Sequence, residues 1–252
     1  MKKAYFNWST GKDSSLALYK VLQDKEFEIG TLLTNVNGEF RRVSMHGLRE
    51  ELLDRQVKLI GLPLQKIHFS GDVTMSLYDE IMKKEMRKIT NQNYNYAIFG
   101  DIFLEDLRVY RDKTLKEVNL QGIYPLWKKD TTALLKEFLE LGFKAITVCV
   151  NAKLLDESFV GRIVDQQFID DLPDGVDLCG ENGEFHTFVF DGPLFKEPVT
   201  FDIGEKVLRT YKETEGNCVN YNKPKNEDCY KEKKDQQSWD TGFWYCDLIP
   251  NF

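Results

Sequence analysis

Residues 5–15 read YFNWSTGKDSS, and this stretch decides the fold. An apolar, aromatic run ends at Trp8, a turn rich in hydroxyl groups follows, and from Leu16 an apolar pattern resumes with helical spacing. In an open parallel sheet, ligands bind beyond the carboxyl ends of the strands, where the chain turns into the next helix. The stretch therefore predicts a strand, a ligand-binding turn and a helix in direct succession.

The residues that follow repeat this alternation of strand and helix. Continuous apolar runs, as in parallel strands covered on both faces, lie at 4–8, 29–34, 64–69, 96–100 and 145–150. Apolar residues at helical spacing lie at 14–23, 48–60, 77–89 and 131–141. This order predicts an α/β fold, a Rossmann-like doubly wound parallel sheet. We expect it to occupy residues 1–150.

The sequence pattern changes after residue 151. Short strand-like runs at 185–190, 199–203 and 243–248 stand among polar, Gly- and Asp-rich segments. These runs predict a smaller, mixed α+β region over residues 151–252. Within that region, residues 212–238 are charged and almost without aliphatic side chains, which predicts a long inserted loop.

Charge and cysteine content exclude several classes of protein. The net charge is −7, which argues against a broad nucleic-acid or anionic-membrane surface. No apolar run is long enough to span a bilayer, and the first residues lack the pattern of a signal peptide. The five cysteines are widely spaced, which fits a reducing compartment better than a disulfide framework. We expect a cytoplasmic protein without a membrane or nucleic-acid partner, and leave a homodimer open.

The turn after the first strand has the chemistry of a phosphate site. Its residues are Ser9, Thr10, Gly11, Lys12, Asp13 and Ser14. Glycine leaves backbone N–H groups free to face an anion, and the helix N-terminus adds partial positive charge. Lys12 offers a point charge, and Asp13 can hold Mg²⁺ or cap the helix. A capped strand-to-helix turn without a ligand is the alternative.

The sequence of the turn, STGKDS, matches neither a Walker A loop nor a GxGxxG dinucleotide motif. It resembles the PP-loop, SGGxDS, of the adenine nucleotide α-hydrolase superfamily, whose members split ATP between the α and β phosphates. Thr10 stands in place of the first glycine, so the backbone there must accept a Cβ atom. The resemblance implies that the turn cradles the phosphates of ATP.

A second motif lies at residues 177–195, DLCGENGEFHTFVFDGPLF. By composition alone it could be a solvated acidic hairpin. Its GENGEFHT and DGPLF segments resemble the glutamate-rich signature of the diphthine–ammonia ligase family, most closely the bacterial-type branch. Further similar segments follow the family's order at 45–64, 100–112, 125–127 and 142–155. The resemblance covers nearly the whole chain except the charged insertion.

The resemblance implies an ATP-dependent ligase with ATP and Mg²⁺ as cofactors. ATP would adenylate a carboxylate, and ammonia would then displace AMP to give an amide. The acceptor would be diphthine on elongation factor 2 or a small-molecule acid. The residues implied for ATP are those of the turn together with Gly100 and Asp101, with Asp13 as the metal ligand. Those implied for the acceptor side are Glu181, Asn182, Glu184 and His186.

Physical chemistry indicates roles for several residues of that set. Lys12 would offset negative charge on the departing pyrophosphate. Glu181 and Glu184 could bind ammonium and accept its proton, which is our own hypothesis. For His46 the sequence leaves two roles open, a place in the ATP site and a structural hydrogen bond. His68 stands at the end of an apolar run, which favours a structural role over a catalytic one.

Two other functions compete with the ligase. One is a regulatory module that binds ATP without turnover, and the other is a PP-loop enzyme acting on tRNA. The net charge of −7 and the absence of paired cysteines argue against tRNA. Arg108 and Arg111 could neutralise a phosphate or belong to a solvated helix face. Trp8 and Trp127 are expected in the hydrophobic core or in the wall of a pocket.

Overall fold

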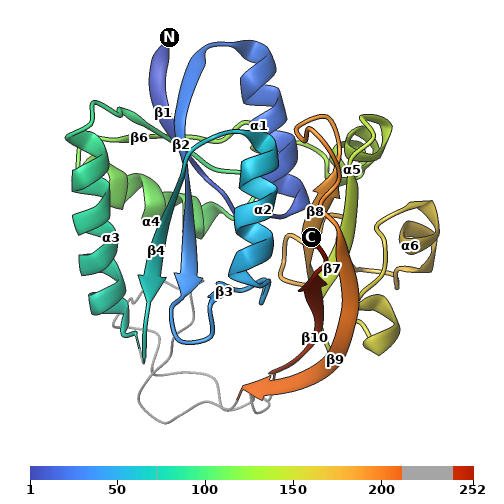
Figure 1. Ribbon diagram of the computed structural model, residues 1–252. Helices are drawn as coiled ribbons and strands as arrows, with labels where there is room; N and C mark the ends of the chain where they lie inside the picture. The colour runs from blue at the N-terminus through green and yellow to red at the C-terminus, as the bar shows by residue number, and fades with distance from the viewer. Residues whose placement is uncertain (72, 212–240) are drawn as a thin grey trace, which may run out of the picture.

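The computed structural model describes residues 1–71, 73–211 and 241–252, and Figure 1 shows two β-sheets lying side by side. The charged insertion expected at 212–238 lies outside the described residues. No helix in the described part of the chain is long and apolar enough to cross a membrane.

The first sheet is the doubly wound parallel sheet that the sequence predicts. Its parallel strands run in the order β4, β2, β1, β5, β6, and β3 is a short antiparallel addition to the end of β2. The strands are β1 (Lys2–Asn7), β2 (Phe27–Asn37), β3 (Arg42–Val43), β4 (Leu64–Phe69), β5 (Tyr96–Ile98) and β6 (Gln121–Ile123). The carboxyl ends of β1 and β5 therefore lie next to each other.

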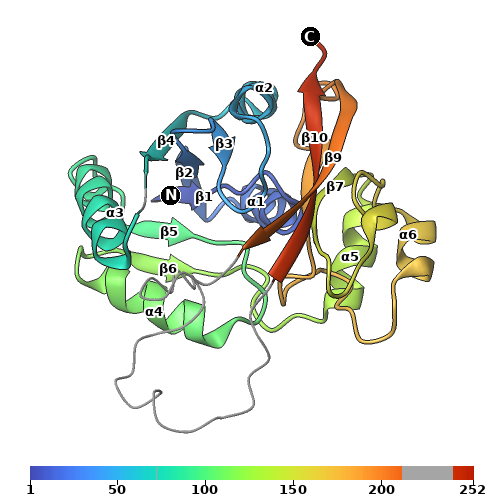
Figure 2. The same cartoon turned by 90° about the horizontal axis from the view of Figure 1, so that it is seen from below.

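Helices cover both faces of this sheet (Figure 2). They are α1 (Lys12–Asp24), α2 (Glu50–Ile60), α3 (Met75–Thr90) and α4 (Glu105–Lys116). Side chains alternate along β1, so Phe6 joins the core formed with α1 and α2, whereas Tyr5 joins the core formed with α3 and α4. The helices α1 and α2 lie between the two sheets.

The second sheet is antiparallel, in the order β8, β7, β10, β9. Its strands are β7 (Lys144–Asn151), β8 (Phe185–Asp191), β9 (Phe201–Tyr211) and β10 (Thr241–Pro250). The remaining helices are α5 (Thr131–Glu140), the short 3₁₀ helix η1 (Glu157–Phe159) and α6 (Gln166–Asp171).

The strand at 145–150, which we expected in the parallel sheet, belongs to this second sheet. It forms β7, whose neighbours are β8 and β10, so a division of the chain at residue 150 would separate β7 from both. The expectation was wrong because Ala145–Val150 is buried on both faces, and a strand buried on both faces has the same continuous apolar sequence in either kind of sheet.

One hydrophobic core runs from the first sheet through α1 and α2 to the second sheet. Its fully or almost fully buried members include Phe6, Leu18, Leu53, Phe138 and Phe188. The two sheets therefore share a single packed interior.

A buried glutamine adds hydrogen bonds to this shared core. Gln56 of α2 is 0% exposed, and its Nε2 donates to the carbonyl oxygens of Thr10 (3.1 Å) and Val189 (2.7 Å). Its Oε1 accepts from Trp8 Nε1 at 2.8 Å. The backbone N–H of Val189 also donates to the Thr10 carbonyl, at 3.0 Å. The turn after β1 is thus hydrogen-bonded to β8 of the second sheet.

We predict that Gln56→Leu lowers the free energy of unfolding by about 2–4 kcal/mol, because three buried polar groups, the Trp8 indole N–H and the carbonyls of Thr10 and Val189, lose a partner. Urea denaturation measures the change. Gln167→Leu, at an exposed position on α6, is the control and should cost no more than about 0.5 kcal/mol. If both variants lose the same small amount of unfolding free energy, the stabilising role assigned to Gln56 is contradicted.

Candidate active site

The turn between β1 and α1 has an unusual backbone at Thr10. This residue has φ 74°, in the left-handed region that a β-branched residue rarely adopts. Thr10 is 0% exposed, and its Oγ1 has no hydrogen-bond partner among the described residues. Its carbonyl is held by Gln56 and Val189. The Cβ atom that replaces the PP-loop glycine is therefore accommodated in a glycine-like conformation.

The serine hydroxyls of the turn form hydrogen bonds within the turn. Ser9 Oγ donates to Ser14 Oγ at 3.0 Å, and Ser14 Oγ donates to the Gly11 carbonyl at 2.9 Å. Gly11 is the N-cap of α1 and supplies no side-chain cap. The first helical N–H, that of Lys12, instead donates to Thr187 Oγ1 on β8 at 3.1 Å. The second sheet therefore caps the helix of the first.

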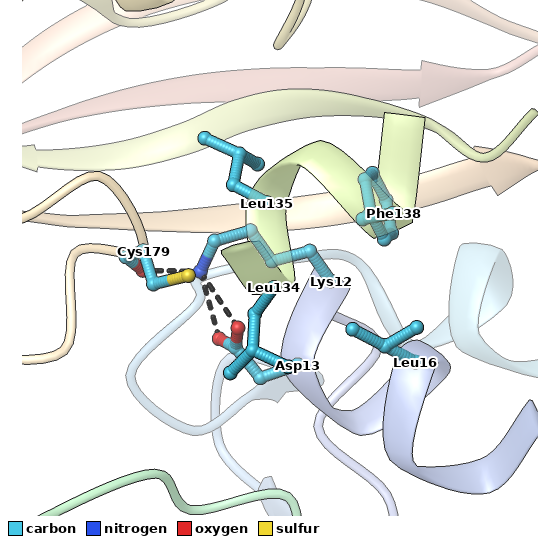
Figure 3. Close-up of a pocket in the computed structure, with 7 residues that line it drawn as sticks. All are labelled: Lys12, Asp13, Leu16, Leu134, Leu135, Phe138 and Cys179. Atoms are coloured by element: carbon cyan, nitrogen blue, oxygen red, sulfur yellow. Dashed lines mark hydrogen bonds and ion pairs between the residues drawn. The ribbon is translucent and has the colours of Figure 1, made fainter. Parts of the chain in front are cut away.

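Lys12 joins the turn to the acidic loop 177–184, as Figure 3 shows. Its ammonium is within 2.8 Å of the Asp13 carboxylate and donates to the Cys179 carbonyl. Around its 4% exposed side chain is a hollow too tight to admit a water molecule. Burial favours the neutral amine, but Asp13, Cys179 and Glu181 together outweigh it, so the pKa of Lys12 is raised. Lys12 is a buried cation that fixes the loop against α1.

Of the two glutamates in the acidic loop, Glu184 forms internal hydrogen bonds. It is 2% exposed and accepts from the backbone N–H groups of Asp177 (3.2 Å) and Asn182 (2.9 Å) and from Asn182 Nδ2 (3.0 Å). These bonds close the loop on itself. The structure thus places Glu184 in the interior of the loop that was expected to face the acceptor.

Glu181 reaches out of the same loop towards the first sheet. Its Oε1 accepts from the backbone N–H of Ile102, in the segment after β5, at 2.8 Å. Burial, and then the nearby negative charge of Asp13, raise the pKa of Glu181 to about 7. Asp101 adds to this effect, although its own carboxylate pairs with Arg111. The pKa of Glu181 therefore lies near neutral pH.

Gly100 lets the segment after β5 approach the start of α1. A Cβ atom at this position would lie 2.9 Å from the backbone nitrogen of Ser14. The structure thus brings Gly100 beside the first residues of α1. That Gly100 and Asp101 border a nucleotide stays a prediction.

Two histidines from different sheets stack on each other beside the turn. The rings of His46 and His186 have centroids 4.9 Å apart and an interplanar angle of 26°. His46 Nδ1 lies 3.1 Å from the Thr187 carbonyl, which only accepts, so Nδ1 donates and Nε2 is free to accept. Burial lowers the pKa of His46 to about 3 and that of His186 to about 4. Both rings are neutral at pH 7.

Asp247 on β10 holds the loop that carries His46. It accepts from Arg42 Nη1 at 2.9 Å and from Arg49 Nη2 at 2.6 Å, and Arg42 Nη1 also donates to the Gly47 carbonyl at 2.6 Å. Sequence reasoning missed this role, as it missed those of Gln56 and Thr187. Each acts across the two sheets on residues more than 40 positions away, and no sequence pattern of neighbours signals such a pairing.

The remaining sequence candidates lie at the edges of this cluster. His68 Nε2 is 3.2 Å from Glu50 Oε1, in the structural setting expected of it. The guanidinium of Arg108 lies 4.7 Å from the Tyr124 ring and 4.4 Å from the Trp127 ring. Of the two arginines on α4, only Arg111 pairs with a carboxylate of the candidate site, that of Asp101.

A magnesium ion fits the donors of this site when it is shared with phosphates. Among the described residues, no three metal-binding side chains come together. Mg²⁺ is commonly held by one or two carboxylates together with substrate phosphates and water, so a full protein cage is not required. Lys12 pairs with Asp13 and Arg111 pairs with Asp101, whereas Glu181 forms no ion pair among the described residues, and burial followed by the charge of Asp13 raises its pKa. The charge of the site suits a cation.

We predict that the stability of the protein falls as pH rises from about 5 to 8, in part because of Glu181. A carboxyl whose pKa is about 7 in the folded chain and near 4.5 when unfolded binds more protons when folded across this range. Glu181→Gln should flatten the dependence, measured by urea denaturation at several pH values. The exposed Glu39→Gln is the control and should keep the wild-type slope. An unchanged slope in Glu181→Gln would contradict the prediction.

Two family domains match most of the chain. Residues 1–122 match the diphthamide synthase N-terminal domain, and residues 130–223 match the diphthamide synthase C-terminal domain. These matches confirm the resemblance inferred from the two motifs.

Among curated proteins, the human diphthine–ammonia ligase is 31% identical over 145 residues, which cover 56% of this chain and 53% of the human protein. The zebrafish (Danio rerio) diphthine–ammonia ligase is 26% identical over 175 residues, which cover 64% of this chain and 69% of that protein. The chain thus spans about half the length of the human relative. Among solved structures, the U34-tRNA thiolase of Methanococcus maripaludis is similar with a TM-score of 0.35 and 22% identity, over 56% of this chain and 57% of that one.

Proposed function

Because this chain belongs to the diphthamide synthase family, we propose that it is an ATP-dependent ligase that amidates a carboxylate with ammonia and releases AMP and pyrophosphate. The observation that carries the proposal is the junction of the two motifs. Lys12 of the PP-loop-like turn bonds to the acidic loop, and Glu181 of that loop reaches back to the segment after β5. ATP chemistry and proton transfer can therefore take place at one point.

ATP is proposed to bind with its phosphates at the N-terminus of α1. The helix end has partial positive charge, and Lys12 adds a full positive charge. Gly100 and Asp101 border the same end of the helix. Asp13 is the proposed ligand of Mg²⁺, which when bound would offset negative charge on the phosphates.

The first chemical step of the proposal activates the acceptor. A carboxylate oxygen forms a bond to the α-phosphorus of ATP, the bond between the α-phosphorus and the bridging oxygen breaks, and pyrophosphate leaves. Negative charge grows on the departing group, and the buried cation of Lys12 would stabilise it more strongly than a solvated lysine could.

In the second step, ammonia attacks the activated carbonyl and AMP departs with the electrons of the C–O bond. Most ammonia is ammonium at neutral pH, so a base must accept a proton. We assign this role to Glu181, since its pKa of about 7 lets it both accept and release a proton near neutrality. Glu184, the other candidate, is assigned to holding the loop, because its hydrogen bonds lie within the loop.

The proposed acceptor is diphthine, which the names of the human and zebrafish relatives contain. That diphthine is carried by elongation factor 2 is what the family resemblance of the sequence implies. A cytoplasmic setting is part of the proposal. The three cysteines within the described residues, Cys149, Cys179 and Cys246, are free and buried, which suits a reducing compartment.

We predict that ATP labelled at the α-phosphate yields labelled AMP, with pyrophosphate, when the protein is supplied with Mg²⁺, ammonium and an acceptor-containing extract. Chromatography of the labelled nucleotides gives the result. Asp13→Ala should abolish AMP formation, and Asp24→Ala, at an exposed position at the end of α1, should not. ADP as the product, or tight ATP binding without turnover, would contradict the ligase and favour a regulatory ATP-binding module.

We predict that Glu181→Gln lowers kcat for amide formation by about 100-fold or more, because the base is lost, while the Kd for ATP changes less than about twofold. In the wild type, kcat should rise with pH through about 7, since only the ionised carboxylate accepts a proton.

The matched variant is Glu184→Gln, which should lower stability while leaving the pH profile of the remaining activity in place. Steady-state kinetics from pH 5.5 to 8.5 separate the two glutamates. A lost pH profile in Glu184→Gln and a retained one in Glu181→Gln would reverse the assignment.

A further inference from the structure

We propose that Thr187 is an ATP-site residue, whose hydroxyl caps α1 and donates its hydrogen to a phosphate oxygen of the nucleotide. The inference rests on the proposed binding of ATP at the N-terminus of α1. It adds a residue from the second sheet to a site otherwise formed by the first.

The hydroxyl already occupies the place where a phosphate contact is needed. Thr187 Oγ1 accepts from the backbone N–H of Lys12 at 3.1 Å. It would lie 3.4 Å from a Cβ atom at Gly11, so it borders the turn directly. An anion that approaches the first N–H groups of the helix must come next to this oxygen.

Among the described residues, two hydroxyls at the turn have no acceptor for their hydrogen, those of Thr10 and Thr187. Ser9 Oγ donates to Ser14 Oγ, and the hydroxyls of Ser14 and Ser15 both donate to the Gly11 carbonyl. Thr10 and Thr187 are both buried, at 0% and 2% exposed, but only Thr187 Oγ1 contacts the first N–H of α1, where the phosphate is proposed to bind. A hydroxyl has one hydrogen to donate as well as lone pairs to accept, and among the described residues that of Thr187 has no acceptor.

The backbone around Thr187 fixes the hydroxyl in this position. Two residues further along β8, Val189 N–H donates to the Thr10 carbonyl at 3.0 Å, and the Thr187 carbonyl is 3.1 Å from His46 Nδ1. The strand is thus held to the turn and to the His46 loop at once. A donor held in place before binding loses little entropy when the phosphate arrives.

The experiment compares Thr187→Val, which keeps the shape but removes the hydroxyl, with Thr187→Ser, which keeps the hydroxyl. Competition against a fluorescent ATP analogue gives the affinities for ATP and for adenosine. We expect Thr187→Val to weaken ATP binding by about 10-fold or more and adenosine binding by less than about twofold. Thr187→Ser should stay within about threefold of the wild type for both ligands.

A role confined to capping α1 would distort the turn, and Thr187→Val would then weaken ATP and adenosine equally, which would overturn the proposal. Unchanged ATP binding in Thr187→Val would overturn it as well. Thermal unfolding checks that each variant is folded, and Thr187→Ala serves for the same comparison if the valine variant is not. A wild type that binds no ATP would instead refute the proposed function itself.

Discussion

The carbonyl oxygen of Thr10 joins the turn after β1 to the second sheet, and the arrangement of the site depends on this connection. It accepts hydrogen bonds from Gln56 Nε2 on α2 and from Val189 N–H on β8. With these two bonds in place, β8 lies against the turn, and Thr187 reaches the first N–H of α1. The acidic loop that leads into β8 is then within reach of Lys12. The site is therefore a consequence of how the second sheet is bonded to one peptide group of the first.

The charges gathered by this arrangement are unequal. Lys12 is the buried cation, facing the carboxylates of Asp13 and Glu181, and the two stacked histidines are neutral because burial lowers their pKa values. Burial of the Glu181 carboxyl, and then the nearby negative charge of Asp13, disfavour its ionised form and raise its pKa. Such a perturbation is typical of functional sites, where stability is given up for reactivity. A cation, or a proton on Glu181, relieves it.

Sequence patterns predicted most of the helices and strands because their periodicity reports burial directly. The limits at α2 and β4 follow from Gly61-Leu62-Pro63, which must end a helix before a strand. The same patterns could not assign β7 to its sheet, since burial on both faces looks alike in parallel and antiparallel strands. They also could not separate Glu181 from Glu184. The two differ only in which backbone N–H groups they meet, and that depends on the closed shape of the loop.

The threonine in place of the motif's glycine has a physical explanation in this fold. A left-handed conformation costs a residue with a Cβ atom about 1–2 kcal/mol relative to glycine. Each buried hydrogen bond contributes roughly 0.5–1.5 kcal/mol. The two bonds to the Thr10 carbonyl, a backbone group, are together of the same size as this strain and hold the peptide in place. Glycine adopts a positive φ without steric cost, whereas at Thr10 hydrogen bonds from α2 and from the second sheet hold the residue at this φ. The conformation of the turn is therefore held by contacts of the assembled fold, with Thr10 in the left-handed region.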